Sequence, residues 1–170
     1  MVLRLAAAAA VLSAASCGYH ISGRADALPK ALHTIAIPAF GNVTTRYKLA
    51  ERLTAATVRE FITRTRYRVV ADPGEADATL TGSLVNYFSF PTVIDQNTGR
   101  STGVQVLVIV QITLTANDGT VIYSRPNFEV RERYEIAIDP EAYFDESEVA
   151  MDRLSRDVAR TVVSAVLEKF

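Results

Sequence analysis

The stretch Gly103-Val-Gln-Val-Leu-Val-Ile-Val-Gln-Ile-Thr-Leu-Thr-Ala116 carries the clearest pattern in this chain. Every even-numbered position from Val104 to Leu114 is aliphatic. Because successive side chains of a strand point to opposite faces, these residues share one face of an extended segment. The sequence therefore predicts a long strand with one buried face over residues 103–116.

Strand patterns lie on both sides of this segment. Residues 78–90 alternate between two faces, and a polar loop, residues 91–102, follows them. The face of 78–90 that is expected to be apolar carries Leu80, Leu84, Phe88 and Phe90. Asn117-Asp-Gly119 is typical of a tight reversal, and residues 120–134 are again strand-like, with an interruption at Pro126. Three long strands with short connections predict an antiparallel meander.

The part before the meander has the order strand, helix, strand. Residues 32–37 are a short apolar run that stops at Pro38. Residues 46–64 have helical periodicity, with Thr44 or Thr45 available as the N-cap. Residues 66–71 return to strand chemistry, which indicates a split or direct βαβ unit. The apolar helix face carries Leu49, Ala50, Leu53, Ala56, Thr57 and Phe61.

A final helix begins at Asp139-Pro140 and continues to Phe170. Acidic residues in its first turns interact favourably with the helix dipole, and they lack the spacing of a calcium-binding loop. Its apolar positions are Met151, Leu154, Val158, Val162, Ala165 and Val166. Together the elements predict an α+β fold of order β-α-β-β-β-α, with a mixed or antiparallel four-stranded sheet and two helices packed on one face.

Composition excludes several classes of function. The 170 residues are enough for one domain whose core needs no disulfide. A net charge of −1, from 18 basic and 19 acidic residues, argues against nucleic-acid binding. One Cys and two His residues leave no material for a multi-cysteine metal site and little for a zinc site or a catalytic triad. We therefore expect no metal, no cofactor and no enzymatic activity.

The amino terminus predicts a processing segment. Residues 1–16 combine a basic residue, an apolar run and small residues, the pattern of a secretory signal peptide, and the run is too short to cross a membrane. Cys17 then stands where a bacterial lipobox places its cysteine. This resemblance implies a diacylglycerol and an N-acyl chain on Cys17, and Gly18 after it favours transfer to the outer membrane. Residues 17–30 are then a lipidated tether, and residues 31–170 a single domain.

An ordered series of short stretches resembles the LptE family of lipopolysaccharide-assembly lipoproteins. The stretches are Cys17-Gly-Tyr-His20, Gly23 with Leu28-Pro29, Ile35-Ala-Ile-Pro38-Ala-Phe-Gly-Asn42-Val-Thr44, Leu49-Ala-Glu-Arg-Leu-Thr54, Arg64-Thr-Arg-Tyr-Arg68-Val-Val70 and Glu75-Ala-Asp77-Ala-Thr-Leu80-Thr-Gly82. The resemblance implies a non-enzymatic, periplasm-facing protein anchored in the outer membrane. It also implies that the protein plugs and helps assemble a large LptD-like β-barrel translocon and binds lipopolysaccharide.

Basic side chains are the candidate lipopolysaccharide contacts. If residues 64–68 are extended, Arg64, Arg66 and Arg68 lie on one side, where arginine forks can bind the phosphates of lipid A. The alternative is a solvated strand edge paired with nearby carboxylates. Arg100, near the tip of the polar loop, is a further candidate, or simply a soluble loop residue.

Two other clusters allow more than one interpretation. Arg131 and Arg133 share a strand face with acidic neighbours, which indicates cross-strand ion pairs rather than a ligand site. Tyr87, Phe88 and Phe90 are expected to pack in the core and along a sheet edge, with contact to a barrel lumen or an acyl chain as the alternative. The alternative for the whole protein is a generic periplasm-facing adaptor lipoprotein without a lipopolysaccharide role.

Overall fold

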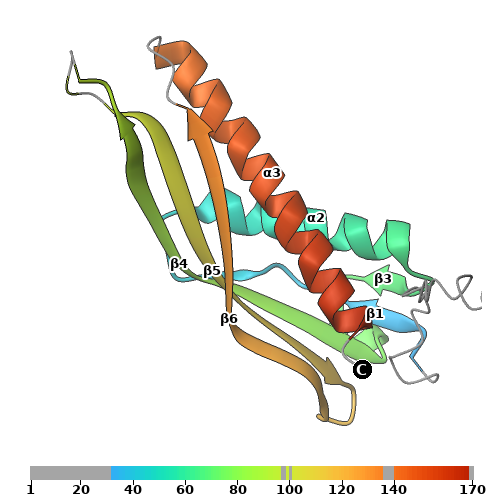
Figure 1. Cartoon of the computed structure of the whole chain (residues 1–170). Coiled ribbons are helices and arrows are strands. Elements are labelled where there is room, and N and C mark those ends of the chain that lie inside the picture. Colours follow the sequence, from blue (N-terminus) through green and yellow to red (C-terminus); the bar gives the residue numbers. More distant parts are fainter. Residues whose placement is uncertain (1–31, 97–98, 100, 136–139, 169–170) are drawn as a thin grey trace, which may run out of the picture.

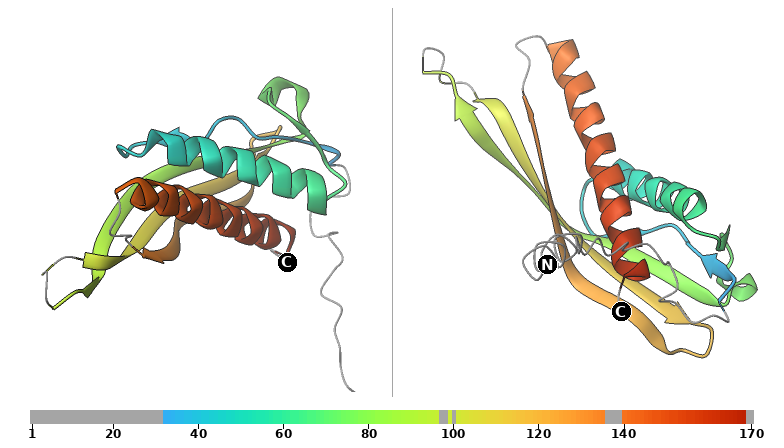
Figure 2. Two further views of the ribbon diagram at one scale, coloured as in Figure 1. Left: turned by 90° about the horizontal axis from the view of Figure 1, so that it is seen from above. Right: turned by 45° about the vertical axis from the view of Figure 1, so that its right-hand side comes forward.

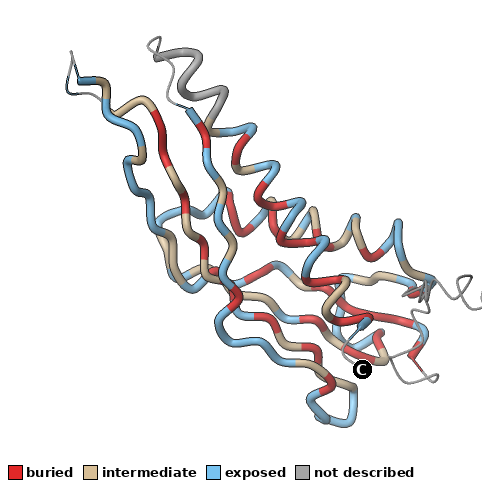
Figure 3. The backbone as a smooth tube through the Cα atoms, viewed as in Figure 1, coloured by how far each residue is buried: buried red, intermediate tan, exposed pale blue. Residues whose placement is uncertain are grey.

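The alternating stretch 103–116 forms the central strand of a long meander. The computed structural model describes residues 32–96, 99, 101–135 and 140–168, with side chains of the last helix described from Ser147. Strand β5 spans Ser101–Ala116, and its even-numbered residues from Val104 to Leu114 are all buried (Figure 3). This confirms the predicted strand and its buried face.

Strands β4 (Ala78–Ile94) and β6 (Val121–Glu135) flank β5, and both pairings are antiparallel (Figure 1). The turn between β5 and β6 is tight because Gly119 adopts a φ of +88°, a conformation that favours glycine. The Gly119 N–H donates to the carbonyl of Ala116 at 2.9 Å. The antiparallel meander predicted from the loop spacing is confirmed.

The preceding part forms a direct βαβ unit. Strands β1 (Thr34–Ala36) and β3 (Arg68–Val70) pair in parallel, and helix α2 (Tyr47–Arg64) connects them. Strand β1 also pairs in parallel with the start of β4, at Ile35 and Ala78. The order across the sheet is therefore β3-β1-β4-β5-β6.

A two-residue strand, β2 (Gly41–Asn42), also pairs with β4, so the sheet has six strands rather than the four predicted. The predicted segments 32–37 and 66–71 contain β1 and β3, so β2 is the strand that was missed, because two residues are too short to show an alternating pattern. The predicted count of four was also one short of the five strand segments that the sequence indicated. A short 3₁₀ turn, η2 (Pro73–Glu75), connects β3 to β4. The α+β class is confirmed.

Helix α3 (Pro140–Leu167) packs beside α2, and both helices lie on the same side of the sheet (Figure 2). Leu53 and Phe61 of α2 and Leu154 and Val158 of α3 have no exposed surface. They meet the even-numbered side chains of β5 in one continuous core. We call the sheet face under the helices the inner face and the opposite one the outer face.

A β-bulge changes which side chains of β4 enter the core. Leu84 pairs with Val110 and Asn86 with Ile109, so Val85 is an extra residue in the ladder. Beyond the bulge, Tyr87 packs against the core, whereas Phe88 and Phe90 are 39% and 48% exposed on the outer face. The prediction that Phe88 and Phe90 share a face with Leu80 and Leu84 is therefore wrong, because strict alternation does not continue through a bulge.

The predicted loop 91–102 is also too long. Strand β4 continues through Pro91 to Ile94, and β5 begins at Ser101. In this part β4 has β5 as its only partner among the described strands, and a strand edge tolerates the missing N–H of proline. Pro126 likewise lies within β6, where the register with β5 shifts between Val110 and Ile112.

Asp77, just before β4, forms hydrogen bonds to the backbone at the start of β1. Its carboxylate oxygen accepts hydrogen bonds from the backbone N–H groups of His33 at 2.8 Å and Thr34 at 2.9 Å. Its own N–H donates to the carbonyl of Thr34, and its carbonyl accepts from Asn117. The two N–H donors, His33 first, hold the pKa of Asp77 below its ordinary value of 3.8.

We expect Asp77→Asn to lower stability at neutral pH and to weaken its dependence on acid. The carboxylate of Asp77 stabilises the fold at pH values above 3.8, and this contribution is lost as the pH falls through the lower pKa of the folded chain. The variant keeps an acceptor oxygen but has no charge to lose. Urea unfolding of both proteins at neutral pH and at about pH 3 measures the difference. An identical loss on acidification in both proteins would contradict this role.

Candidate functional site

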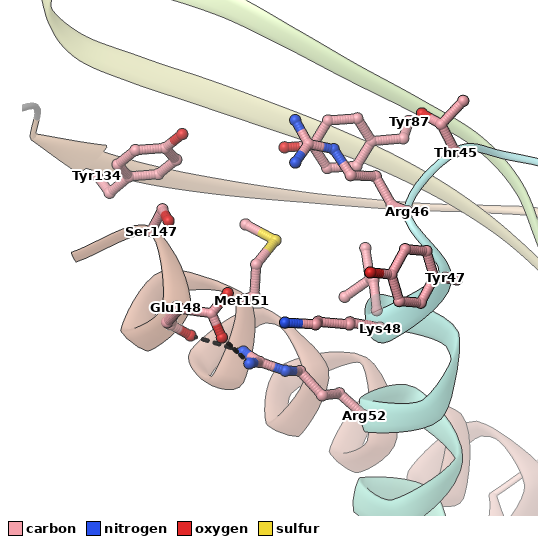
Figure 4. Close-up of a pocket in the computed structure, with 11 residues that line it drawn as sticks. Thr45, Arg46, Tyr47, Lys48, Arg52, Tyr87, Tyr134, Ser147, Glu148 and Met151 are labelled. Carbon is pink, nitrogen blue, oxygen red and sulfur yellow. Dashed lines mark hydrogen bonds and ion pairs between the residues drawn. The ribbon is translucent and has the colours of Figure 1, made fainter. Parts of the chain in front are cut away.

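A cavity of about 350 Å³ lies where the start of α2 faces the first described turns of α3 (Figure 4). The inner face of the sheet adds Tyr87 from β4 and Tyr134 from β6. Leu49 of α2 and Met151 of α3 contribute apolar walls. A volume of this size is typical of small-molecule pockets, which combine apolar walls with a few polar groups.

One cation at this cavity is already engaged. Arg52 of α2 pairs with the carboxylate of Glu148 on α3 and lies 3.1 Å from a carboxylate oxygen of Asp152. It also donates to the main-chain carbonyl of Glu148 at 3.0 Å. Because these side chains are partly or mostly exposed, the pairs contribute little stability. They link α2 to α3 beside the cavity.

Two further cations line the cavity without a carboxylate. The guanidinium of Arg46 lies 4.7 Å from the centre of the Tyr87 ring, a cation–π contact. Lys48 extends from the first turn of α2 toward Met151 (Figure 4). In the described part of the chain, neither Arg46 nor Lys48 forms an ion pair. The mouth of the cavity is therefore positively charged.

The way α2 begins adds to this charge. The side-chain oxygen of Asn42 accepts from the N–H and hydroxyl of Thr44, and the Thr44 hydroxyl accepts from the N–H of Arg46 at 3.1 Å. These turns place Arg46 at the N-cap, so the prediction of Thr44 or Thr45 there is wrong. No side chain caps the helix, and its first turn holds no acidic residue. The positive end of the helix dipole is left uncompensated.

The upper part of the outer face, beyond the bulge, is apolar with arginines beside it. Phe88 and Phe90 stack with ring centres 6.0 Å apart. Cross-strand pairing aligns Phe88, Leu107 and Arg131 in one row across β4, β5 and β6, and Phe90, Gln105 and Arg133 in another. We call this the aromatic face, made of Phe88, Phe90, Leu107, Ile109, Arg131 and Arg133. Apolar surface adjoining guanidinium groups suits a ligand that has both acyl chains and phosphates.

Below the bulge the outer face is rich in hydroxyl groups. We call this part the hydroxyl face, made of Thr79, Thr81, Ser83, Gln111, Thr113, Thr115 and Ser124. The Thr81 hydroxyl donates to the carbonyl of Thr113, whose own hydroxyl lies 3.4 Å from that of Ser124. The outer face therefore changes from polar to apolar along one continuous sheet.

The arginines at residues 64–68 do not form one extended row. Arg64 is the last residue of α2, and its guanidinium lies 3.1 Å from Glu60 and 2.9 Å from the hydroxyl of Ser164 on α3. Arg68 begins β3, with Arg66 between the two elements. The expectation of an extended segment is wrong because the helix continues through Arg64. Lipopolysaccharide contact by Arg66 and Arg68 stays a prediction.

Other predicted features have mixed outcomes. Arg131 pairs with Glu129 at 3.4 Å, so this strand face does carry an ion pair, although within β6 rather than across strands. Cys17 and Arg100 lie outside the described residues. Within the described residues, no three potential metal ligands come together, and no helix has the length and apolar character needed to span a membrane.

The sequence did not indicate the cavity, and it offered an exposed role for Phe88 and Phe90 only as an alternative. The unusual start of α2, basic and without an acidic first turn, was visible in the sequence. What that turn faces depends on how α3 packs, which no local pattern encodes. The sequence favours a core position for Phe88 and Phe90 because it does not show the bulge at Val85, which reverses the two faces of β4.

Comparison with known proteins places this fold. A family model described as LptE, lipopolysaccharide-assembly, matches residues 32–166. No curated protein matches the sequence. Uncharacterized lipoprotein B from Nitrosomonas europaea has a similar structure, with a TM-score of 0.60, 13% identity, and coverage of 81% of this chain and 84% of the other. A Xanthomonas campestris protein of the DUF330 family has a TM-score of 0.57 and 14% identity, with coverage of 82% and 86%.

The structural neighbours are too distant in sequence to show more than the fold. The family model is decisive because its match begins at residue 32, two residues before β1, and ends at residue 166 in the last turn of α3. It therefore includes every strand of the sheet. The chain belongs to the LptE lipopolysaccharide-assembly family.

Proposed function

We propose that this protein is an outer-membrane lipoprotein that plugs and helps assemble a large β-barrel translocon and contacts lipopolysaccharide on its way to the outer leaflet. The family match over residues 32–166 is the observation that carries the proposal. In this proposal the protein acts by binding, with no catalytic step, and faces the periplasm.

The proposed anchor is Cys17, modified with diacylglycerol and an N-acyl chain. Two or more acyl chains hold a protein stably on a membrane, whereas one chain binds reversibly. The residues between Cys17 and the first described residue, Leu32, would serve as the tether. Mass spectrometry of the mature chain tests this directly, because an unmodified Cys17 would exclude the anchor.

The aromatic face is the proposed lipopolysaccharide contact. Phe88 and Phe90 offer exposed apolar rings to acyl chains, and Arg131 and Arg133 lie on the same face, where guanidinium groups can bind phosphates. Arg131 would exchange its exposed partner Glu129 for the phosphate. Arg66, Arg68 and Arg100 remain further candidates. Arg64 is a weaker candidate because its guanidinium is engaged with Glu60 and Ser164.

The hydroxyl face is the proposed contact with the barrel wall. The lumen of a large outer-membrane barrel is polar, so a plug needs a surface that exchanges hydrogen bonds with it. Rows of Thr and Ser on the lower outer face can donate and accept in many directions. A polar surface of this kind fits a lumen better than the aromatic face does.

Co-purification from outer membranes tests the proposed function. A tagged full-length chain should recover a large β-barrel protein, and depletion of the chain should leave that barrel misassembled and lipopolysaccharide inside the cell. Recovery of the chain alone, with normal lipopolysaccharide at the surface after depletion, would overturn the proposal. That outcome would favour a generic periplasmic adaptor.

A further inference from the structure

We propose that the cavity at the start of α2 is a binding site for a phosphate monoester carried on a small apolar or ring-shaped body. The cavity lies on the inner face of the sheet, under the helices, and is therefore separate from the aromatic face. The inference goes beyond the proposed function and does not depend on it.

The charge of the cavity selects an anion. Arg46 and Lys48 have no carboxylate partner in the described part of the chain, and Arg52 is already neutralised by Glu148 and Asp152. Because Arg52 faces two carboxylates, the described charged groups at the cavity leave an excess of one positive charge. An anion would balance this excess.

The arrangement of donors favours phosphate over carboxylate. Arg46, at the N-cap of α2, provides a planar fork for two oxygens, and Lys48 provides a compact point charge from the first turn of the helix. The start of α2, which has no side-chain cap, supplies the positive end of a helix dipole to the same region. A phosphate monoester has three terminal oxygens to meet donors from these different directions, whereas a carboxylate has two.

The walls define the rest of the ligand. Tyr87 of β4 and Tyr134 of β6 present aromatic surface from the strands on either side of β5, and Met151 faces them from α3 (Figure 4). Methionine adapts its shape to ring-shaped groups, and aromatic side chains stack on them. The volume of about 350 Å³ limits this body to a small group.

Phenyl phosphate is a suitable probe because it joins a ring to a phosphate monoester. Isothermal titration of the full mature chain, in a nonionic detergent, should show saturable binding of phenyl phosphate and weaker binding of inorganic phosphate and phenylacetate. The affinity should fall at high salt and should rise as the pH passes about 6, where the phosphate takes its second charge.

Arg46→Gln and Lys48→Gln should each weaken phenyl phosphate binding about tenfold, which corresponds to about 1.4 kcal/mol. Both side chains are exposed, so neither change should affect folding, and circular dichroism checks this. Arg59→Gln is the matched control, because Arg59 lies on the same helix but away from the cavity. No saturable binding, or equal affinity in all three variants, would overturn the proposal.

Vesicles distinguish the source of the phosphate. Phosphatidylcholine vesicles that contain phosphatidic acid, but not pure phosphatidylcholine vesicles, should displace phenyl phosphate if the site takes a lipid headgroup. Displacement by neither vesicle assigns the site to a soluble phosphate monoester. Each result supports the site, provided that Arg46→Gln and Lys48→Gln abolish most of the binding. Both variants should leave barrel co-purification intact, which separates this test from that of the proposed function.

Discussion

Replacing Leu154 with alanine lowers the free energy of unfolding by about 2–5 kcal/mol, because the change leaves a cavity between α3 and the sheet. Leu154 has no exposed surface and belongs to the core cluster that joins both helices to β5. A domain of ordinary stability, about 5–15 kcal/mol, would lose a large share of that stability.

Val149→Ala is the matched control on the same helix, because Val149 is 50% exposed. Its effect should stay within about 0.5 kcal/mol, as for most surface changes. Urea midpoints of the two variants measure the difference at constant m-value. If Leu154→Ala and Val149→Ala were equally stable, α3 would not pack on the sheet as described.

If the aromatic face is the proposed lipopolysaccharide contact, replacing Phe88 and Phe90 together with serine weakens lipopolysaccharide binding at least tenfold while stability changes little. Large aromatic side chains at the centre of an interface often contribute about 2 kcal/mol or more each, and tenfold in affinity corresponds to about 1.4 kcal/mol. Both rings lie on the outer face, away from the core, so their loss opens no internal cavity.

The measurement is the affinity of the native chain and of the double variant for purified lipopolysaccharide. Val121→Ser is the matched control, since Val121 is 55% exposed at the opposite end of the sheet. Tyr87→Ser should lower the free energy of unfolding, in contrast to the double variant, because Tyr87 is next to Phe88 in β4 but packs against the core. Unchanged affinity in the double variant would remove the aromatic face from the lipopolysaccharide contact but leave the family assignment intact.

The sequence was most informative where one pattern runs over many residues. The alternation in 103–116 and the helical spacing in 46–64 correctly predicted β5 and α2 to within a few residues. The ordered short stretches also indicated the correct family. The two periodic patterns depend on neighbouring residues, and the family resemblance depends on the order of short stretches along the chain. None of them requires knowledge of which strands pair.

The candidate site was harder to predict than the fold. Arg64 was assigned to an extended run, but α2 continues to it and its guanidinium binds partners on α2 and α3. Arg131 and Arg133 were interpreted as members of ion pairs because acidic residues share their strand face, and Arg131 does pair with Glu129. That they also share a face with Phe88 and Phe90 depends on the register of β4 and β6 with β5, which the sequence does not show. The position of Arg64 and this shared face both depend on contacts between segments far apart in the chain.

The sequence by itself determined the α+β class, the meander and the helices, because hydrophobic periodicity is a property of neighbouring residues. Only the tertiary structure decided which face Phe88 and Phe90 occupy, since the bulge at Val85 exists only in the register between β4 and β5. It likewise decided that Arg46 and Lys48 share a cavity with Tyr134, because that cavity forms only when α3 packs across the sheet.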